Sequence, residues 1–277
     1  MANEKRSWSS LPAEIRIQIL ESILQNNHNL GSCAAVSREW QEMIEHHNFS
    51  RIHLTPERVT DLNETTHRTR SLVRYIWLRI ELEEYDCDDC APEDFEKWDL
   101  SDEDNALITE TMESLFYTLS EWEKNDELLL DISVYSPSDS KHWFKYLTFE
   151  PDDLPDDCSL GRCPVPTPFH GGFPHGWSDG SEERPKWNSD PDKAFLQDPP
   201  NHYAVKKVFQ DIMPDGPAYI DSLRPFRPRE EGRWWQELPS VPAVTGVLLR
   251  QQTRRRFKPD SVARMFSRFS NLQEIHY

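Results

Sequence analysis

Cysteine residues are the first groups in this sequence that could carry chemistry. Cys87 and Cys90 are separated by two residues, and Cys158 and Cys163 by four, so the two pairs could place four thiolates around a tetrahedral zinc ion. The aspartates beside the first pair disfavour deprotonation of its thiols, and the second pair lies far along the chain. We therefore predict that the protein has no metal site. If one exists, these four cysteines are the candidate ligands.

A second cluster has the residue types of a nucleophilic hydrolase. Ser136, Ser138, Asp139 and His142 lie within seven consecutive positions, whereas a catalytic triad converges from separated segments and needs an oxyanion hole. The sequence also has no G-x-S-x-G turn to present a nucleophile. A turn followed by a helix that Ser138 or Asp139 caps is the better interpretation.

Two charged stretches could bind partners. Residues 81–104 are strongly acidic but lack the spacing of a calcium loop, so a solvated loop or a contact for a basic substrate segment are the alternatives. Residues 253–258 read TRRRFK, which could act in nuclear import or contact phosphates. A strand end whose arginine stems lie along apolar surface explains this second stretch equally well.

The composition excludes several classes of function. The chain has 277 residues and a net charge of −18, a field that repels phosphate backbones, so we expect no nucleic-acid partner. No apolar run is long enough to span a membrane, and the first residues lack the apolar segment of a secretory signal. Glycine-rich phosphate loops are absent, and we expect no cofactor. An odd count of 5 cysteines fits reduced thiols in the cytoplasm, the nucleus or both.

Strands and helices recur along most of the chain and predict an α/β region. Tyr75 and Trp77 alternate with Ile76 and Leu78, which indicates a strand that is covered on both sides. The predicted order is a short strand near 49–54 with helical residues to 65, a strand over 73–82, a helix over 106–122 and a strand over 126–136, then a strand over 244–252, a helix over 260–272 and a strand from 272. Residues 151–240 lack this pattern and predict a long loop or disordered insertion, with one helix over 203–212.

The first fifty residues predict three short helices. Isoleucine and leucine residues between Ile15 and Leu24 cover more than half of the first helix, and only Arg16 interrupts them. Ser37 can cap the third helix. Units below about 40 residues rarely bury enough apolar surface to fold alone, so a second body must cover this one. That body is a partner protein or the chain's own next domain.

Leu11-Pro12, Glu14-Ile15, Val36-Ser37 and Trp40, with the leucines and isoleucine between them, resemble the F-box in type and spacing. The resemblance implies that these helices dock on a Skp-type adaptor, which links them to a cullin scaffold and a ubiquitin-conjugating enzyme. It places eight side chains at the adaptor interface: Leu11, Pro12, Ile15, Ile19, Leu24, Leu30, Val36 and Trp40. We expect some of Ile23, Cys33 and Ile44 in the core of the bundle itself.

Four later stretches, 74–87, 132–144, 244–257 and 271–277, resemble a group of fungal F-box proteins with degenerate leucine-rich-repeat-like C-terminal regions. The resemblance also suggests that the chain stops early, inside a strand. The resulting fold prediction is α+β, with an F-box bundle over 1–50 and an irregular repeat-like α/β region over 51–277 that recruits a substrate.

The predicted function is that of a non-catalytic substrate adaptor in an SCF-type cullin ubiquitin ligase. Two alternatives stay open. One is a metal-dependent or hydrolytic enzyme built on the central Cys, His and Asp residues, and the other is an F-box scaffold protein that acts outside any ligase.

Overall fold

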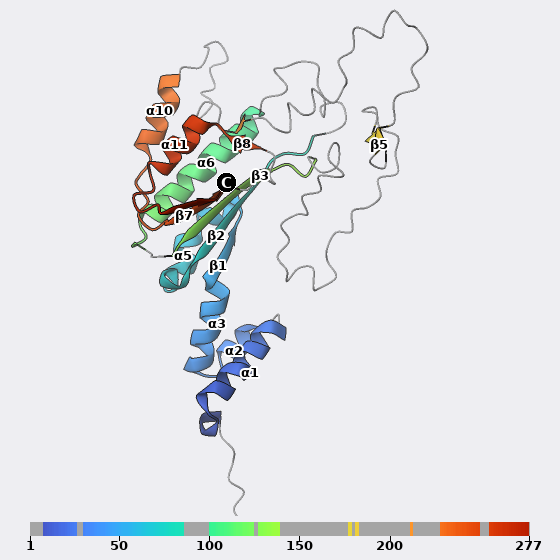
Figure 1. The fold of residues 1–277 in the computed structure, drawn as a ribbon, viewed down its shortest axis with the longest axis vertical. Coiled ribbons are helices and arrows are strands. Elements are labelled where there is room, and N and C mark those ends of the chain that lie inside the picture. Colours follow the sequence, from blue (N-terminus) through green and yellow to red (C-terminus); the bar gives the residue numbers. More distant parts are fainter. Residues whose placement is uncertain are drawn as a thin grey trace, which may run out of the picture.

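The chain forms a slender group of N-terminal helices joined to a larger α/β body (Figure 1). The computed structural model describes residues 8–26, 30–85, 100–124, 127–138, 177–178, 181–182, 211–212, 228–249 and 255–276. Among these residues, no helix is both long and apolar enough to cross a membrane.

The N-terminal part contains a short 3-10 helix and three α-helices: η1 (Trp8–Ser10), α1 (Ala13–Asn26), α2 (Leu30–Ala34) and α3 (Arg38–Ser50). The predicted cap of the third helix is confirmed, because the Ser37 hydroxyl accepts a hydrogen bond from the Trp40 amide at 3.4 Å. The predicted strand near 49–54 begins later than expected. Phe49 still belongs to α3, and its half-buried ring lies on the last helical turn.

Five strands form one parallel sheet: β1 (Arg51–Leu54), β2 (Tyr75–Glu81), β3 (Leu129–Tyr135), β7 (Gly246–Leu249) and β9 (Glu274–His276). They lie in chain order, so each strand pairs with the next one along the sequence in this set. The register aligns one apolar row across the whole sheet: Ile52, Ile76, Leu130, Val247 and Ile275. Alternation along each strand therefore puts one continuous apolar face toward the helices.

The helices of the body are α4 (Pro56–Val59), α5 (Leu62–Thr66), η2 (Arg70–Leu72), α6 (Asp102–Ser120), α10 (Pro228–Glu237) and α11 (Pro259–Phe266). Of these, α6, α10 and α11 lie together beside the sheet (Figure 1). Phe116 of α6 is fully buried between them, 5.2 Å from the ring of Phe269 and 6.1 Å from that of Trp235. This aromatic cluster joins the helices to the core over the sheet.

The opposite face of the sheet carries polar and aromatic side chains. The Trp77 indole donates to the Ser133 hydroxyl at 2.8 Å, and the His53 ring meets Trp77 edge-on at 4.9 Å. The Arg79 guanidinium lies 4.5 Å from the centre of the Tyr135 ring. Trp77 is only 3% exposed and Leu78 is 0% exposed, so the prediction that this strand is covered on both sides is confirmed.

Several predicted boundaries were wrong. The helix predicted over 106–122 begins four residues earlier, because the Ser101 hydroxyl caps it by accepting from the Asp104 amide at 3.0 Å. Within the helix predicted over 203–212, Asp211 and Ile212 instead form strand β6 and pair with β8 (Arg256–Phe257). The rest of that predicted helix lies outside the described residues.

The predicted loop over 151–240 also contains regular structure. Helix α10 begins at Pro228 within it, and the short strands β4 (Trp177–Ser178) and β5 (Ser181–Glu182) pair there. Helix α10 forms because Trp235 and Leu238 are buried against the body. The apolar side of this helix is difficult to recognise from the sequence because most of its residues are charged or polar. The fold is thus a set of N-terminal helices followed by a mixed α/β body with a five-stranded parallel sheet.

Candidate functional site

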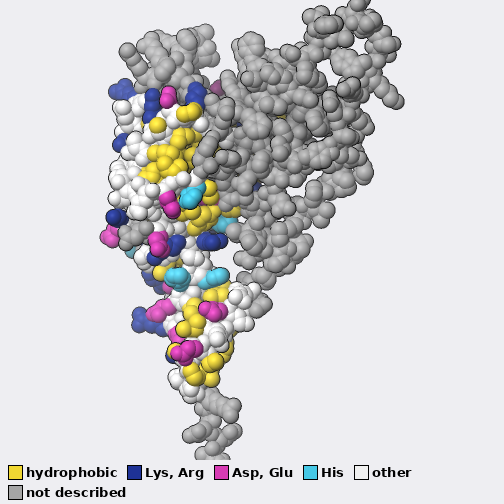
Figure 2. All heavy atoms as spheres, in the orientation of Figure 1, with side chains coloured by type: hydrophobic (Ala, Val, Ile, Leu, Met, Phe, Trp, Pro, Cys, Tyr) yellow, Lys and Arg dark blue, Asp and Glu magenta, His cyan; other side chains and the backbone are white. Residues whose placement is uncertain are grey.

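Exposed hydrophobic side chains concentrate on the N-terminal helices. Among the described residues, seven large hydrophobic side chains are exposed, and five of them lie there: Leu11 (37%), Ile15 (41%), Ile17 (42%), Ile19 (36%) and Val36 (63%). Figure 2 shows hydrophobic atoms at the surface of this narrow end of the molecule. Surfaces of this kind mark contact sites for another protein.

Helix α1 is apolar on two flanks, and it contacts α3 through the strip between them. Ile15 and Ile19 are four residues apart in α1, so they line one flank, and the exposed Leu11 lies just before the helix. Ile17 lies roughly 160–200° around the helix from Ile15 and Ile19, on the other flank. Leu20 lies between the flanks and is 1% exposed. The aliphatic residues of α1 therefore exceed what α3 can cover.

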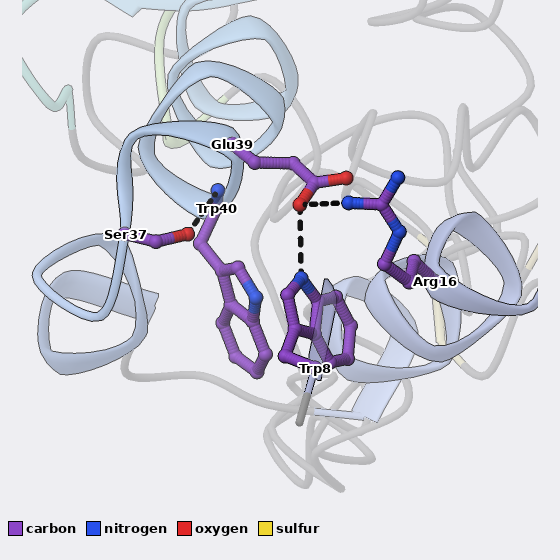
Figure 3. Close-up of polar contacts among 5 residues, drawn as sticks. All are labelled: Trp8, Arg16, Ser37, Glu39 and Trp40. Carbon is purple, nitrogen blue, oxygen red and sulfur yellow. Dashed lines mark hydrogen bonds and ion pairs between the residues drawn. The ribbon is translucent and has the colours of Figure 1, made fainter. Parts of the chain in front are cut away.

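A polar network fixes η1 and α1 against α3 (Figure 3). One carboxylate oxygen of Glu39 accepts from the Trp8 indole at 2.9 Å and from the Arg16 guanidinium at 2.8 Å. The rings of Trp8 and Trp40 lie 5.2 Å apart with a tilt of 59°. Arg16, which interrupts the apolar arc of the first helix, thus binds the third helix. These contacts hold the exposed flank of α1 in a defined orientation.

The eight side chains assigned to the adaptor interface fall into two groups. Leu11, Pro12, Ile15, Ile19 and Val36 are exposed, whereas Leu24, Leu30 and Trp40 are half-buried. Trp40 owes part of its burial to Trp8, a contact that no sequence pattern predicted. Ile17 was not among the predicted interface residues, although its side chain is as exposed as that of Ile15.

The core of the helical unit contains one of the three residues of which some were predicted to lie there. Ile44 is 2% exposed and lies in the core, as expected, while Ile23 and Cys33 are only half-buried. Leu20 takes the central place instead. The sequence signal for this was its position at the middle of the apolar arc, where a neighbouring helix covers a side chain best.

The N-terminal helices connect to the body without a linker. Helix α3 ends at Ser50 and β1 begins at Arg51, and the Ser50 carbonyl accepts from the Arg74 amide at 2.9 Å. Arg68 forms an ion pair with Glu45 across the same junction. The end of α3 is therefore anchored to the body through main-chain and side-chain contacts.

The other candidate residues do not assemble a second site within the described part of the chain. The Ser136 hydroxyl donates to the Glu83 carbonyl at 2.7 Å, and the Ser138 hydroxyl accepts from the Tyr85 amide at 3.0 Å, so both serines tie the end of β3 to the segment after β2. The described residues contain no group of His, Cys, Asp and Glu that could hold a metal ion. Several candidates lie outside the described residues: Cys87, Cys90, Cys158, Cys163, Asp139, His142, residues 86–99 of the acidic stretch and residues 253–254 of the basic stretch.

Comparison with known proteins agrees with the placement of this apolar surface. Residues 8–55 match the family model described as F-box-like. No curated protein and no solved structure matches the chain. The matched segment begins at Trp8, the residue that binds Glu39, and it ends just after β1.

Proposed function

We propose that this chain is a substrate-recognition adaptor of an SCF-type cullin ubiquitin ligase. F-box domains bind Skp-type adaptors, and residues 8–55 are F-box-like. In this proposal the helices dock on the adaptor, the adaptor links them to a cullin scaffold, and the body recruits a protein for ubiquitin transfer. The chain itself then performs no catalysis.

The exposed flank of α1 carries the proposal. Leu11, Ile15 and Ile19 are each more than a third exposed, although each is a residue type that folding normally buries. Completing the burial of such a side chain stabilises a complex by about 1 kcal/mol, since full burial contributes about 1.5–3 kcal/mol. A row of such residues on a rigid helix is the usual core of a helix-mediated interface.

The same proposal assigns the domains as residues 1–50 for adaptor binding and 51–277 for recruitment. Helix α3 ends at the proposed boundary. Parallel strands that follow one another in chain order support a repeat-like body, because stacked strand–helix units add their strands in this way. The resemblance to fungal F-box proteins with leucine-rich-repeat-like regions points to the same organisation. Function in such a ligase agrees with the expected cytoplasmic or nuclear location.

Binding of a purified Skp-type adaptor tests the proposal. We expect Ile15→Ala combined with Ile19→Ala to weaken binding by at least about 2 kcal/mol, or roughly thirtyfold, in isothermal titration calorimetry. The matched control is Ile275→Ala, which removes a similarly exposed isoleucine from the sheet edge and leaves affinity unchanged. Equal affinity of the double variant and the wild-type chain would refute the interface.

Two variants suggested by the family motif differ in value as tests. Replacing Leu11 and Pro12 together by alanine changes exposed side chains, so a loss of at least about 2 kcal/mol of binding reports on the interface. Trp40→Ala also removes the ring contact with Trp8, so its effect combines binding with folding. Co-purification of a cullin with the wild-type chain then separates a ligase subunit from an F-box scaffold that acts outside a ligase.

A further inference from the structure

A pocket of ≈ 690 Å³ lies where two chain segments lead into neighbouring strands of the sheet. One side is the segment 67–74, which precedes β2, and the other is formed by residues 121–124, directly after α6, and by Glu127, before β3. Its volume falls in the range of ordinary ligand sites. It is separate from the exposed flank of α1 and lies beside the junction with α3, where Arg68 pairs with Glu45.

The pocket gathers several cations in a strongly acidic chain. Four of its ten lining residues are Arg or Lys, with His67 beside them, against three glutamates. Arg68 is paired with Glu45, so Arg70, Arg74 and Lys124 are the cations that remain for a ligand. The chain as a whole has 49 acidic residues and 31 Lys plus Arg. Charges further apart than about 8 Å are largely screened at physiological ionic strength, so a ligand in the pocket responds mainly to the local groups. Cations therefore make up a larger share of the charged groups in the pocket than in the chain as a whole.

One guanidinium in the pocket is held in place by its surroundings. Arg70 donates to the Asn63 side-chain oxygen at 3.0 Å and lies 5.9 Å from the centre of the Trp122 ring. The Trp122 indole donates to the same Asn63 oxygen at 2.9 Å. Asn63 and Trp122 thus fix Arg70 before any ligand binds, which lowers the entropy lost on binding.

The other cations of the pocket can exchange partners. The Arg74 guanidinium donates to the carbonyls of Ser71 and Val73 at 2.6 and 3.1 Å, and it forms an ion pair with Glu127 at 3.5 Å. The side chains of that pair are 39% and 79% exposed, so the pair contributes little and an incoming anion can replace the carboxylate. Within the described residues, the exposed Lys124 makes no ion pair. Three positions from two segments can therefore converge on one anion: Arg70, Arg74 and Lys124.

We propose that this pocket binds a phosphate-type oxyanion, either free or as a phosphoryl group on a peptide side chain. Guanidinium groups bind such oxyanions through paired N–H donors, and an ammonium group adds a further donor. The Ser71 hydroxyl lines the same pocket and can donate to a further oxygen. Arg70 provides the fixed cation, and Arg74 and Lys124 close on the anion.

Calorimetric titration of the full chain tests this site with three probes: inorganic phosphate, a glycine-flanked phosphoserine peptide and its unphosphorylated form. We expect saturable binding of both phosphate probes and none of the unphosphorylated peptide. Tighter binding of the phosphopeptide identifies a peptide-borne group, and equal binding identifies the free ion. Arg74→Gln lowers the affinity by at least about tenfold, and Lys124→Gln lowers it by roughly threefold.

The control is Arg233→Gln on α10, which removes an exposed arginine that, like Arg74, forms an ion pair with a nearby glutamate. It leaves the affinity unchanged if the pocket is the site. An equal loss in Arg233→Gln and Arg74→Gln, or no saturable binding at millimolar phosphate, overturns the proposal. Absence of saturable phosphate binding would mean that these cations only interact favourably with the negative C-terminal end of the α6 dipole. Neither outcome bears on the adaptor interface, because Arg74 and Lys124 lie in the body.

Discussion

The N-terminal helices and the α/β body use the same aliphatic residues in opposite ways. Among the described residues, the body exposes two large hydrophobic side chains, Tyr117 and Ile275, and buries whole rows of isoleucine, leucine and valine beneath its helices. The N-terminal helices bury Leu20 and Ile44 and expose five. Packing therefore holds the body together, whereas a polar network, a helix cap and the junction with the body hold the N-terminal helices.

The largest effect is expected in the core of the body. Phe116→Ala removes a fully buried ring that packs on Phe269 and Trp235, and it should lower the free energy of unfolding by about 3–5 kcal/mol in urea denaturation. Tyr117→Ala, one position further on α6, is the control. Tyr117 is 53% exposed, so its replacement should cost less than about 0.5 kcal/mol. Similar losses of unfolding free energy for the two variants would mean that side-chain packing is not what holds the body together.

A smaller effect is expected at the polar network of the N-terminal helices. Glu39→Gln removes the charge that Arg16 binds, and it should lower the opening free energy of α1 by about 1 kcal/mol, measured by amide hydrogen exchange. Glu42→Gln changes an exposed glutamate on the same helix and should leave exchange unaltered. If exchange of α1 amides is identical in the Glu39 variant, the network does not hold these helices.

The cap of α3 is a further polar contact that we expect to stabilise the N-terminal helices. Ser37→Ala removes the acceptor for the Trp40 amide, and at a donor–acceptor distance of 3.4 Å we expect a loss of about 0.5 kcal/mol from α3. Ser37→Asp retains an acceptor at this position and should restore most of the loss. Hydrogen exchange of the first-turn amides of α3 measures both variants, and an unchanged rate in Ser37→Ala would exclude the cap as a source of stability.

The last effect concerns the polar face of the sheet, and it becomes visible only when the pH rises above about 10. Burial, together with the hydrogen bond to Glu81, raises the pKa of Tyr135 to about 12 from an ordinary value of 10.0. The folded state thus holds this proton more tightly than the unfolded state, so its contribution is complete below about pH 10 and is lost as the pH rises toward 12. Tyr135→Phe should flatten the fall in unfolding free energy over this range. A decline equally steep in the variant would contradict the assignment.

The sequence predicted the elements whose apolar pattern is local. Strand β2 was recognisable because Tyr75 and Trp77 alternate with Ile76 and Leu78, and both sets are packed in the structure. Helix α1 was recognisable from its wide apolar arc. Helix α10 was missed because Pro228 and several charges dominate its sequence, while Trp235 finds its partner, Phe116, far away along the chain.

The features of the candidate site also separate into those that local sequence predicts and those that depend on contacts between distant residues. Exposure of Leu11, Ile15 and Ile19 follows from a helix with more apolar surface than two short neighbours can cover. The contact between Trp8 and Glu39 joins positions 31 residues apart, so no local spacing reveals it. The pocket was missed for a similar reason, because its two sides are distant in the sequence and meet through the pairing of β2 with β3 and the contact of Arg70 with Trp122.

The direct passage of α3 into β1 makes the angular relation between the two parts a function of helix length. Each residue added to an α-helix turns the downstream chain by about 100° and moves it by about 1.5 Å. One extra alanine in the middle of α3 would thus swing the sheet sideways around the helix axis while barely lengthening the molecule. Under the proposed function, the thirteen-residue length of α3 would therefore set the direction in which the body presents a bound target.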